Sequence, residues 1–315
     1  MADYRLKTEC SLIDYLMDLG YTRTKVKQLM KHRAVEVNGK AAKGLDYLLR
    51  TGDTVSVRKD KKESKALQML GIKVVYEDDD LIVIEKPAGL LTIASETEKT
   101  RTAYYQLNEF LKMRTPRSQE RIYIVHRLDR DTSGLIMFAK NEKVKRTLQE
   151  GWKEVEKRYY AVVEGVPVKK EDAIMSRLKE TTSLKVYSDR HADGAKLSKT
   201  TYRVVRAGRI YSLLDILLET GRKNQIRVHL SDIGHPVAGD KKYGAKTDPL
   251  NRIGLHSYLL IFTHPVTRRP LRFESTLPRR FDSLIKKTVE VNQYKSCILQ
   301  SKGGVTHFTK TLDLF

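Results

Sequence analysis

A nine-residue segment in the first half of the chain carries side chains that could perform nucleophilic or acid–base chemistry. It reads His-Arg-Leu-Asp-Arg-Asp-Thr-Ser-Gly from His126 to Gly134, so that two carboxylates alternate with two arginines. A guanidinium group beside a carboxyl group favours its ionised form, and an ionised aspartate that is held in place can act as a nucleophile or a base. The sequence therefore offers Asp129 and Asp131 as candidate catalytic groups. A solvated charged turn is the alternative interpretation.

Two later segments could add an aromatic ring and a cation to this chemistry. A Lys-Arg-Tyr run ends at Tyr159, near the start of a predicted strand, and Gly-Arg-Lys-Asn-Gln-Ile-Arg-Val-His occupies residues 221–229, at the start of a predicted helix. A tyrosine ring can stack on a nucleic-acid base, and an arginine such as Arg227 can keep a partly buried carboxylate charged. Taken singly, Tyr159 could equally be a tyrosine at the edge of a core and Arg227 a surface arginine.

In this order and spacing, the three segments resemble the motifs of the RluA family of RNA pseudouridine synthases. The first matches every specified position of the family signature H-R-L-D-x-x-T-S-G, the second matches K-x-Y, and the third resembles G-R-x-H-Q-I-R-V-H. The resemblance extends over about residues 72 to 282. It implies that Asp129 is the catalytic aspartate, that Tyr159 stacks on the uracil and takes part in proton transfer, and that Arg227 pairs with Asp129.

The same resemblance implies residues that bind the substrate. Arg127 would fill the space left by a uridine flipped out of folded RNA, and Ile226 would line the uracil pocket. His126 either contacts the base or packs at a strand end, and we favour packing. The chain departs from the family at Asn224, where histidine is usual, so that no titrating group is expected at this position. Asp131 occupies a variable position of the signature.

The elements that must position these residues mix strands and helices without strict alternation. Strand-like runs lie on both sides of the signature, at 122–125 and 135–139. Further strands are predicted at 74–76, 81–85, 157–164, 202–205, 211–218, 258–262 and 271–273, and helices at 102–113, 141–154, 223–233 and 277–287. This pattern predicts an α+β fold with a mixed, mainly antiparallel sheet, and by resemblance the pseudouridine synthase fold.

The N-terminal region reads as a separate small α/β domain. Two helices, at 12–19 and 22–32, precede a short strand at 35–37, an Asn-Gly turn and a strand that ends at Val57. Over about residues 10 to 58 this order resembles an S4 RNA-binding domain, although Arg33 replaces a usual glycine. An ordinary α/β module with a solvated basic face is the alternative. The expected RNA-binding residues are the cations of the second helix, Arg23, Lys25, Lys27, Lys31 and Arg33.

We therefore expect four segments along the chain. They are an S4-like domain at 1–62, a charged linker at 63–71, a catalytic domain at 72–289 and a C-terminal tail at 290–315, for which no structure is predicted.

Composition favours a polyanionic partner. The chain has 60 Lys and Arg against 39 Asp and Glu, a formal net charge of +21, which suits RNA, DNA or an anionic surface. No apolar run of about 18 residues is present, so we expect no membrane span. Phosphate-loop and dinucleotide-binding motifs are absent. The two cysteines suit a reducing cytoplasm and are too few for a cysteine-based zinc cluster. We expect a cytoplasmic monomer that uses no cofactor and no metal.

The sequence as a whole predicts an enzyme that isomerises uridine to pseudouridine in structured RNA. Large-subunit ribosomal RNA is the favoured substrate, because the S4-like domain resembles that of rRNA-modifying relatives, and transfer RNA is the alternative. Two other functions remain open. One is a non-catalytic RNA-binding factor in ribosome assembly, and the other is a glycosylase that uses the same aspartate and releases free uracil.

Overall fold

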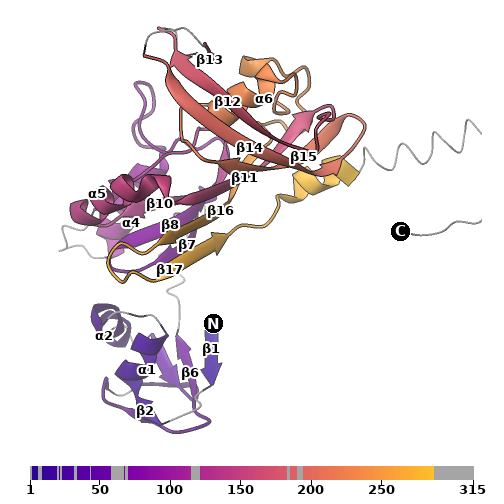
Figure 1. The fold of residues 1–315 in the computed structure, drawn as a ribbon. Coiled ribbons are helices and arrows are strands. Elements are labelled where there is room, and N and C mark those ends of the chain that lie inside the picture. The colour runs from indigo at the N-terminus through magenta and orange to yellow at the C-terminus, as the bar shows by residue number, and fades with distance from the viewer. Residues whose placement is uncertain are drawn as a thin grey trace, which may run out of the picture. The chain divides into compact units, whose positions relative to one another are not determined.

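The computed structural model describes most of the chain, and Figure 1 labels its helices and strands. Contacts between residues divide the chain into two compact units. The described residues are 2–5, 9–19, 21, 23–31, 34–42, 44–57, 67, 70–114, 121–182, 185–189 and 194–286. The first unit contains residues 1–155 and 259–275, and the second contains 156–258 and 276–315. The predicted C-terminal tail and most of the predicted linker lie outside the described residues.

The N-terminal part of the first unit has a core of its own. Helix α1 (Leu12–Asp18) and helix α2 (Arg23–Lys31) share this core with β3 (Val35–Val37) and β6 (Thr54–Val57). A four-stranded sheet has the order β1-β6-β3-β4, with β1 at Ala2–Arg5 and β4 at Lys40–Ala41, and β2 (Cys10–Ser11) pairs with β5 (Leu48–Leu49). Positive φ angles at Asn38 and Gly39 give the tight turn that their sequence predicts.

The remainder of the first unit places the signature segment between two strands. The strand order is β7-β8-β10, with β7 at Lys73–Glu77, β8 at Leu81–Lys86 and β10 at Ser133–Ala139. The short strand β9 (Tyr123–Ile124) also pairs with β10, and the signature loop connects the two. Helix α4 (Ala103–Arg114), helix α5 (Glu142–Glu150), the short helix η1 (Gly151–Lys153) and strand β17 (Pro270–Glu274) complete this unit.

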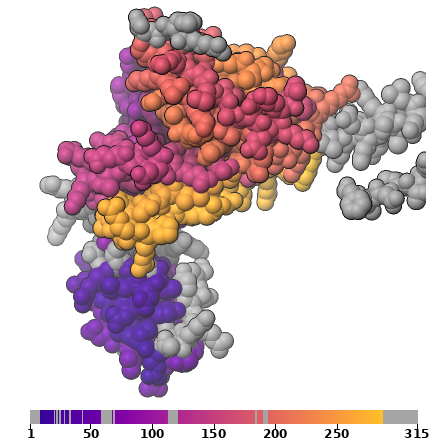
Figure 2. Space-filling view, in the orientation of Figure 1, coloured from indigo at the N-terminus to yellow at the C-terminus, as the bar shows by residue number. Residues whose placement is uncertain are grey.

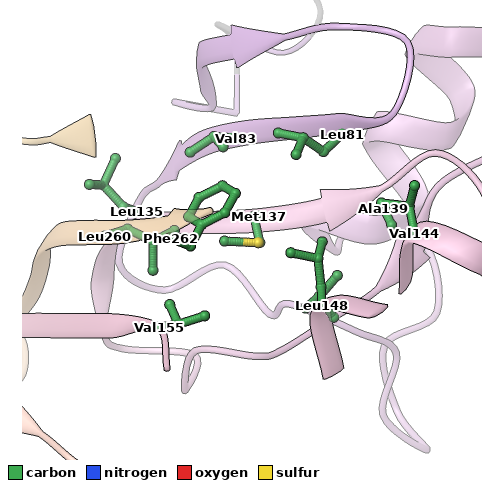
Figure 3. Packing of buried hydrophobic residues seen from close by; sticks show 11 residues of the cluster. Leu81, Val83, Leu135, Met137, Ala139, Val144, Leu148, Val155, Leu260 and Phe262 are labelled. Carbon is green, nitrogen blue, oxygen red and sulfur yellow. The ribbon is translucent and has the colours of Figure 1, made fainter. Parts of the chain in front are cut away.

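The strand that leaves the signature loop is buried along its whole length. Alternate residues of β10, namely Leu135, Met137 and Ala139, pack with Leu148 of α5 and with side chains of β8 and β16 (Figure 3). Ile136 and Phe138 on the other face of β10 are buried just as fully, so a shift of the strand by one residue would move each side chain into a space packed for a different one. The C-terminal end of the signature loop is fixed in this way.

In the second unit, one sheet positions a short helix. The strand order is β13-β12-β14-β15-β11, with β13 at Val186–Ser188, β12 at Glu171–Glu180, β14 at Lys196–Ala207, β15 at Tyr211–Leu218 and β11 at Glu156–Glu164. Helix α6 is Gln225–Asp232, the short helix η2 is Lys241–Tyr243, and residues 279–286 are also helical. Strand β16 (Leu255–Thr263) begins in this unit and ends in the first.

Strand register assigns the side chains of this sheet to two faces. Tyr159, Ile216 and Tyr202 lie opposite one another on β11, β15 and β14, so they share a face. Helix α6 covers that face, because the two ring nitrogens of His229 lie 2.9 Å from Thr200 Oγ1 and 3.0 Å from Ser176 Oγ. The other face carries Asp215 and, towards one end, the apolar contacts of the 279–286 helix.

The predicted α+β class and mainly antiparallel sheet are confirmed, since every strand pair with a described register is antiparallel. The sequence did not predict β12 or β13. The reason is physical, because β12 is exposed or half-buried at nine of its ten positions and so shows no apolar alternation. Met175 and Leu197 are 59% and 53% exposed on this hairpin. In the space-filling view, atoms of β11 to β15 form much of the second unit's visible surface (Figure 2).

Candidate active site

Two hydrogen-bond donors hold the backbone of the signature loop. One is the side chain of Lys86 at the end of β8, and the other is the amide of Gly89 in the turn that follows β8. The side chain of Lys86 is fully buried, and its Nζ donates to the carbonyl oxygens of Pro87 (2.9 Å), Leu90 (2.7 Å) and Arg130 (3.1 Å). The amide of Gly89 donates to the same Arg130 carbonyl at 2.9 Å. Since Arg130 directly follows Asp129, these bonds fix the backbone next to the candidate nucleophile.

One threonine secures the other side of Asp129. The Thr92 hydroxyl donates to the carbonyl of Leu128 at 2.7 Å, and its oxygen accepts from the Leu128 amide at 3.2 Å. Within the loop, the Thr132 amide donates to the Asp129 carbonyl at 3.2 Å, which closes a turn. Asp129 itself is half-buried, on backbone that is held both before and after it.

The charged and aromatic neighbours of Asp129 have distinct surroundings. Arg127 is exposed. Asp131 forms a two-point ion pair with the exposed Arg130, with Nε–Oδ1 at 3.1 Å and Nη2–Oδ2 at 3.2 Å. The ring of His126 packs against that of Trp152, with centres 4.5 Å apart and planes tilted by 32°, and its Nε2 accepts from the Met137 amide of β10 at 3.1 Å. These contacts are those of a packed histidine at a strand end.

The second unit carries Tyr159, Ile226 and Arg227. Tyr159 is buried on β11, on the sheet face that α6 covers. Ile226 and Arg227 are consecutive in the first turn of α6 and are both buried. The structure thus places Asp129, Arg127 and His126 in the first unit and the other three predicted site residues in the second.

The start of α6 is fixed by a glutamine that the sequence analysis did not single out. Gln225 Oε1 accepts from the Thr220 hydroxyl (2.7 Å) and from the Arg222 amide (3.0 Å). Its Nε2 donates to the Lys199 carbonyl and to Thr200 Oγ1, both at 2.9 Å. These four bonds connect the helix to β14 and to the preceding turn, so they determine where Ile226 and Arg227 lie on the sheet.

Arg227 has a partner that sequence reasoning missed. Its Nε donates to Asp240 Oδ2 at 2.6 Å and its Nη2 to Asp240 Oδ1 at 2.8 Å, while Nη1 donates to Asn224 Oδ1 at 3.1 Å. From the sequence, no role was assigned to Asp240. The Gly-Asp pair at 239–240 was the available signal, because a buried carboxylate in a tight turn requires a cation nearby.

Burial shifts two titrating groups on the α6 face. Desolvation lowers the pKa of Lys157, two residues before Tyr159 on the same strand face, to about 8. Desolvation also lowers the pKa of His229 to about 4, although Asp232 opposes the shift. His229 is therefore neutral at pH 7, which suits its two hydroxyl partners.

Asp78, Asp80 and His264 in the first unit approach one another in a way that could suggest a metal site. The hydrogen bonds favour a different interpretation. His264 Nδ1 accepts from the Val266 and Thr267 amides, so the proton is on Nε2, which donates to Asp78 Oδ2 at 2.9 Å. Asp78 also accepts from the Tyr76 hydroxyl at 2.6 Å. The arrangement connects strand ends and shows no vacant nitrogen ligand.

The basic helix presents its cations in one row. Arg23, Lys27 and Lys31 are four residues apart along α2 and are all exposed, whereas Val26 is fully buried. The side chain of Lys25 and the whole of Arg33 lie outside the described residues.

Comparison with known proteins identifies the family. A family model described as RNA pseudouridylate synthase matches residues 80–232, and a model of the S4 domain matches residues 14–55. An RNA pseudouridine synthase of Bacillus subtilis, YlyB, is 36% identical over 281 residues, with 84% of this chain and 89% of the relative covered. The chain belongs to the RNA pseudouridine synthase family. The predicted family and the S4 domain at the N-terminus are confirmed.

Another bacterial relative agrees with the assignment of this chain to the RNA pseudouridine synthase family. An RNA pseudouridine synthase of Aquifex aeolicus is 32% identical over 302 residues, which cover 90% of this chain and 95% of the relative. The structure of human RNA pseudouridylate synthase domain containing 4 has a TM-score of 0.57, at 24% identity, over 70% of this chain and 92% of that one. This last likeness supports the fold. Among the helices that the structure describes, none is long and apolar enough to span a membrane.

Proposed function

We propose that this synthase is a cytoplasmic monomer that converts a uridine of large-subunit ribosomal RNA to pseudouridine, with Asp129 as the catalytic carboxylate. The observation that supports this most strongly is the complete signature around Asp129, on a loop whose backbone is fixed by Lys86 and Thr92. Such a loop presents its carboxylate in one place, as covalent or ion-pair catalysis at a sugar carbon requires.

The reaction breaks the N1–C1′ bond of the uridine and joins C5 of the same base to C1′. Asp129 either attacks C1′ or stabilises positive charge there, and both routes require the ionised carboxylate. The base then rotates, C5 bonds to C1′ and the proton on C5 is removed, while N1 gains a proton. No electron is transferred and no phosphate is consumed, so the proposed chemistry needs neither a metal nor another cofactor.

We assign the other site residues to two tasks, which are to hold the detached uracil and to keep Asp129 ionised. Tyr159 provides a ring on which uracil stacks, an interaction of about 1–3 kcal/mol per base, and its phenol is the candidate group for transfer of the C5 proton. Ile226 lines the same pocket. Arg227 is the cation that keeps Asp129 ionised and oriented. Arg127, which is exposed and precedes Asp129 by two residues, fills the gap left when the uridine flips out of its stack.

A structured RNA substrate is supported by charge and by the S4 domain. The net charge of +21 and the exposed row of cations on α2 suit a polyanion larger than one nucleotide. A second RNA contact in the S4 domain would raise the local concentration of the target uridine. Transfer RNA is the second candidate, because the same features would serve it equally well.

The test is a parallel assay with three substrates. Purified protein is offered free uridine, unmodified tRNA and protein-free large-subunit rRNA, and both pseudouridine and free uracil are measured. We expect pseudouridine in the rRNA, and mapping in cells with and without the gene then locates the site. Conversion of tRNA alone would refute the rRNA assignment. Release of uracil would indicate a glycosylase, and RNA binding without any product would indicate a non-catalytic factor.

A further inference from the structure

Arg227 is enclosed by three side chains of its own unit. Asp240 binds its Nε and Nη2 edge through two bonds, at 2.6 and 2.8 Å, and Asn224 Oδ1 accepts from Nη1 at 3.1 Å. The guanidinium carbon lies 4.9 Å from the ring centre of Tyr243. Asn224 Nδ2 also donates to the Tyr243 hydroxyl at 2.9 Å, so the enclosing residues are bonded to one another. This arrangement leaves the plane of the guanidinium group little freedom to turn.

The loop that carries Asp240 is rigid. The backbone carbonyl of Asp240 accepts from the amides of Tyr243 (3.0 Å) and Ala245 (3.1 Å), and the backbone amide of Asp240 donates to the Val237 carbonyl at 2.9 Å. The preceding Gly239 has φ +81°, and a Cβ there would lie 2.3 Å from the Arg252 carbonyl oxygen. Only glycine fits this backbone. The sequence Gly-Asp at 239–240 therefore delivers the carboxylate to a fixed point beside α6.

A contribution to stability is a weak explanation for this pair. Asp240 is 1% exposed and Arg227 is 8% exposed, and desolvation of two charges offsets much of their attraction, so apolar residues often replace such a pair without loss. A two-point bond between a carboxylate and a guanidinium does, however, fix direction as well as distance. Orientation is what a cation needs if it is to serve a catalytic carboxylate.

We propose that Asp240 is a positioning residue that acts on the reaction solely through Arg227, with Asn224 as its auxiliary. By holding one edge of the guanidinium group at two points, Asp240 fixes the direction in which the charged group of Arg227 faces. This inference rests on the proposed role of Arg227 as the cation for Asp129. It assigns a function to the Gly-Asp loop, which is not part of the family motifs used above.

The test compares Asp240→Asn with a matched control, Asp215→Asn. Asp215 is also a buried carboxylate of the second unit, paired with Arg158 at 2.9 Å, but it lies on the sheet face opposite α6. For Asp240→Asn we expect the single-turnover rate of pseudouridine formation to fall by about tenfold or more, with RNA affinity changed by less than about twofold. For Asp215→Asn we expect a loss of thermal stability with a rate close to that of the wild type. Equal rate losses in both variants would refute the proposal.

A double-mutant cycle separates positioning from general damage. In the background of Arg227→Ala, Asp240→Asn should slow the reaction by less than about twofold, because its effect requires the arginine. A full additional loss in that background would overturn the proposal. If Asp240→Asn fails to fold, Asn224→Gly provides the second variant, because glycine keeps the positive φ of Asn224. It should show a smaller rate loss that also vanishes in the Arg227→Ala background, and an undiminished loss there would count against the proposal.

The two levels of inference can fail separately. A wild-type protein that forms no pseudouridine in any RNA would overturn the proposed function, and the role of Asp240 with it. An active wild type whose rate falls with Arg227→Ala but not with folded Asp240→Asn would overturn only the role of Asp240.

Discussion

Asp129 and Asp131 are two residues apart in the same loop but have different surroundings. Asp131 is bound at two points by its exposed neighbour Arg130, an arrangement typical of a surface ion pair of small energetic value. Asp129 is half-buried, and the backbone on both sides of it is fixed by Lys86 and Thr92. At the residue scale, the choice of Asp129 over Asp131 stays a prediction that rests on the resemblance.

Asp129→Asn should lower pseudouridine formation by at least about a thousandfold, because it removes the charge while it preserves the shape of the side chain. RNA affinity should be retained. The measurement is the single-turnover rate together with RNA binding, and Asp131→Asn is the matched control, with near-normal turnover expected. Near-normal turnover of Asp129→Asn would instead show that the catalytic group lies elsewhere.

At the scale of elements, the catalytic loop depends on a lysine at the end of a neighbouring strand. Lys86→Met keeps the apolar stem but leaves three carbonyl acceptors without their buried donor. We expect the free energy of unfolding to fall by about 3 kcal/mol, with a loss of turnover in the protein that remains folded. Chemical denaturation measures the first effect. Lys73→Met, at a side chain that is 76% exposed, is the control and should change stability by less than about 0.5 kcal/mol.

The attachment of α6 to its sheet should depend on pH through His229. Its pKa is about 4 in the folded protein, against an ordinary value of 6.5. The unfolded chain therefore binds a proton between these values when the folded chain does not, and the stabilising effect, which is complete above pH 6.5, is lost as pH falls towards 4. The loss is at most roughly 3 kcal/mol.

Denaturation of the wild type and of His229→Gln at several pH values tests this dependence. The wild type should lose more stability than the variant between pH 6.5 and pH 4, so the difference between the two proteins should narrow as pH falls. Parallel curves over this range would show that His229 does not titrate as its burial requires.

At the scale of the whole molecule, the positive charge is distributed over a chain with an S4 domain at one end. The row formed by Arg23, Lys27 and Lys31 is exposed on α2. If these cations contact phosphates, replacement of all three by alanine in the full-length protein should weaken RNA binding and lower the slope of log affinity against log salt by roughly 2 to 3.

Titration of RNA at several salt concentrations measures this slope. The control replaces three exposed cations of the second unit, Lys169, Lys170 and Arg209, which lowers the net charge by the same amount. A slope that changes equally in the two triple variants would show that only overall charge matters and that α2 has no specific contact with RNA.

The sequence by itself determined the family, the fold class and the candidate catalytic residues. These were accessible because a nine-residue signature is specific, and because most strands and helices carry the apolar periodicity of their burial. Strand β10, which is buried throughout, and α2, with its row of cations, follow directly from residue types. The hairpin that contains β12 lacks that periodicity, so only hydrogen bonding to β14 identifies it as a strand.

Only the tertiary structure decided which residues support the site. Lys86 is more than forty residues from Arg130 in the sequence, and Asp240 is thirteen residues from Arg227, yet each pair is bonded. No local pattern encodes such pairs, because they depend on how loops return to the same place after the core has formed. Burial raises the energetic importance of these bonds, because a buried cation or carboxylate is costly without a partner and an exposed one is not.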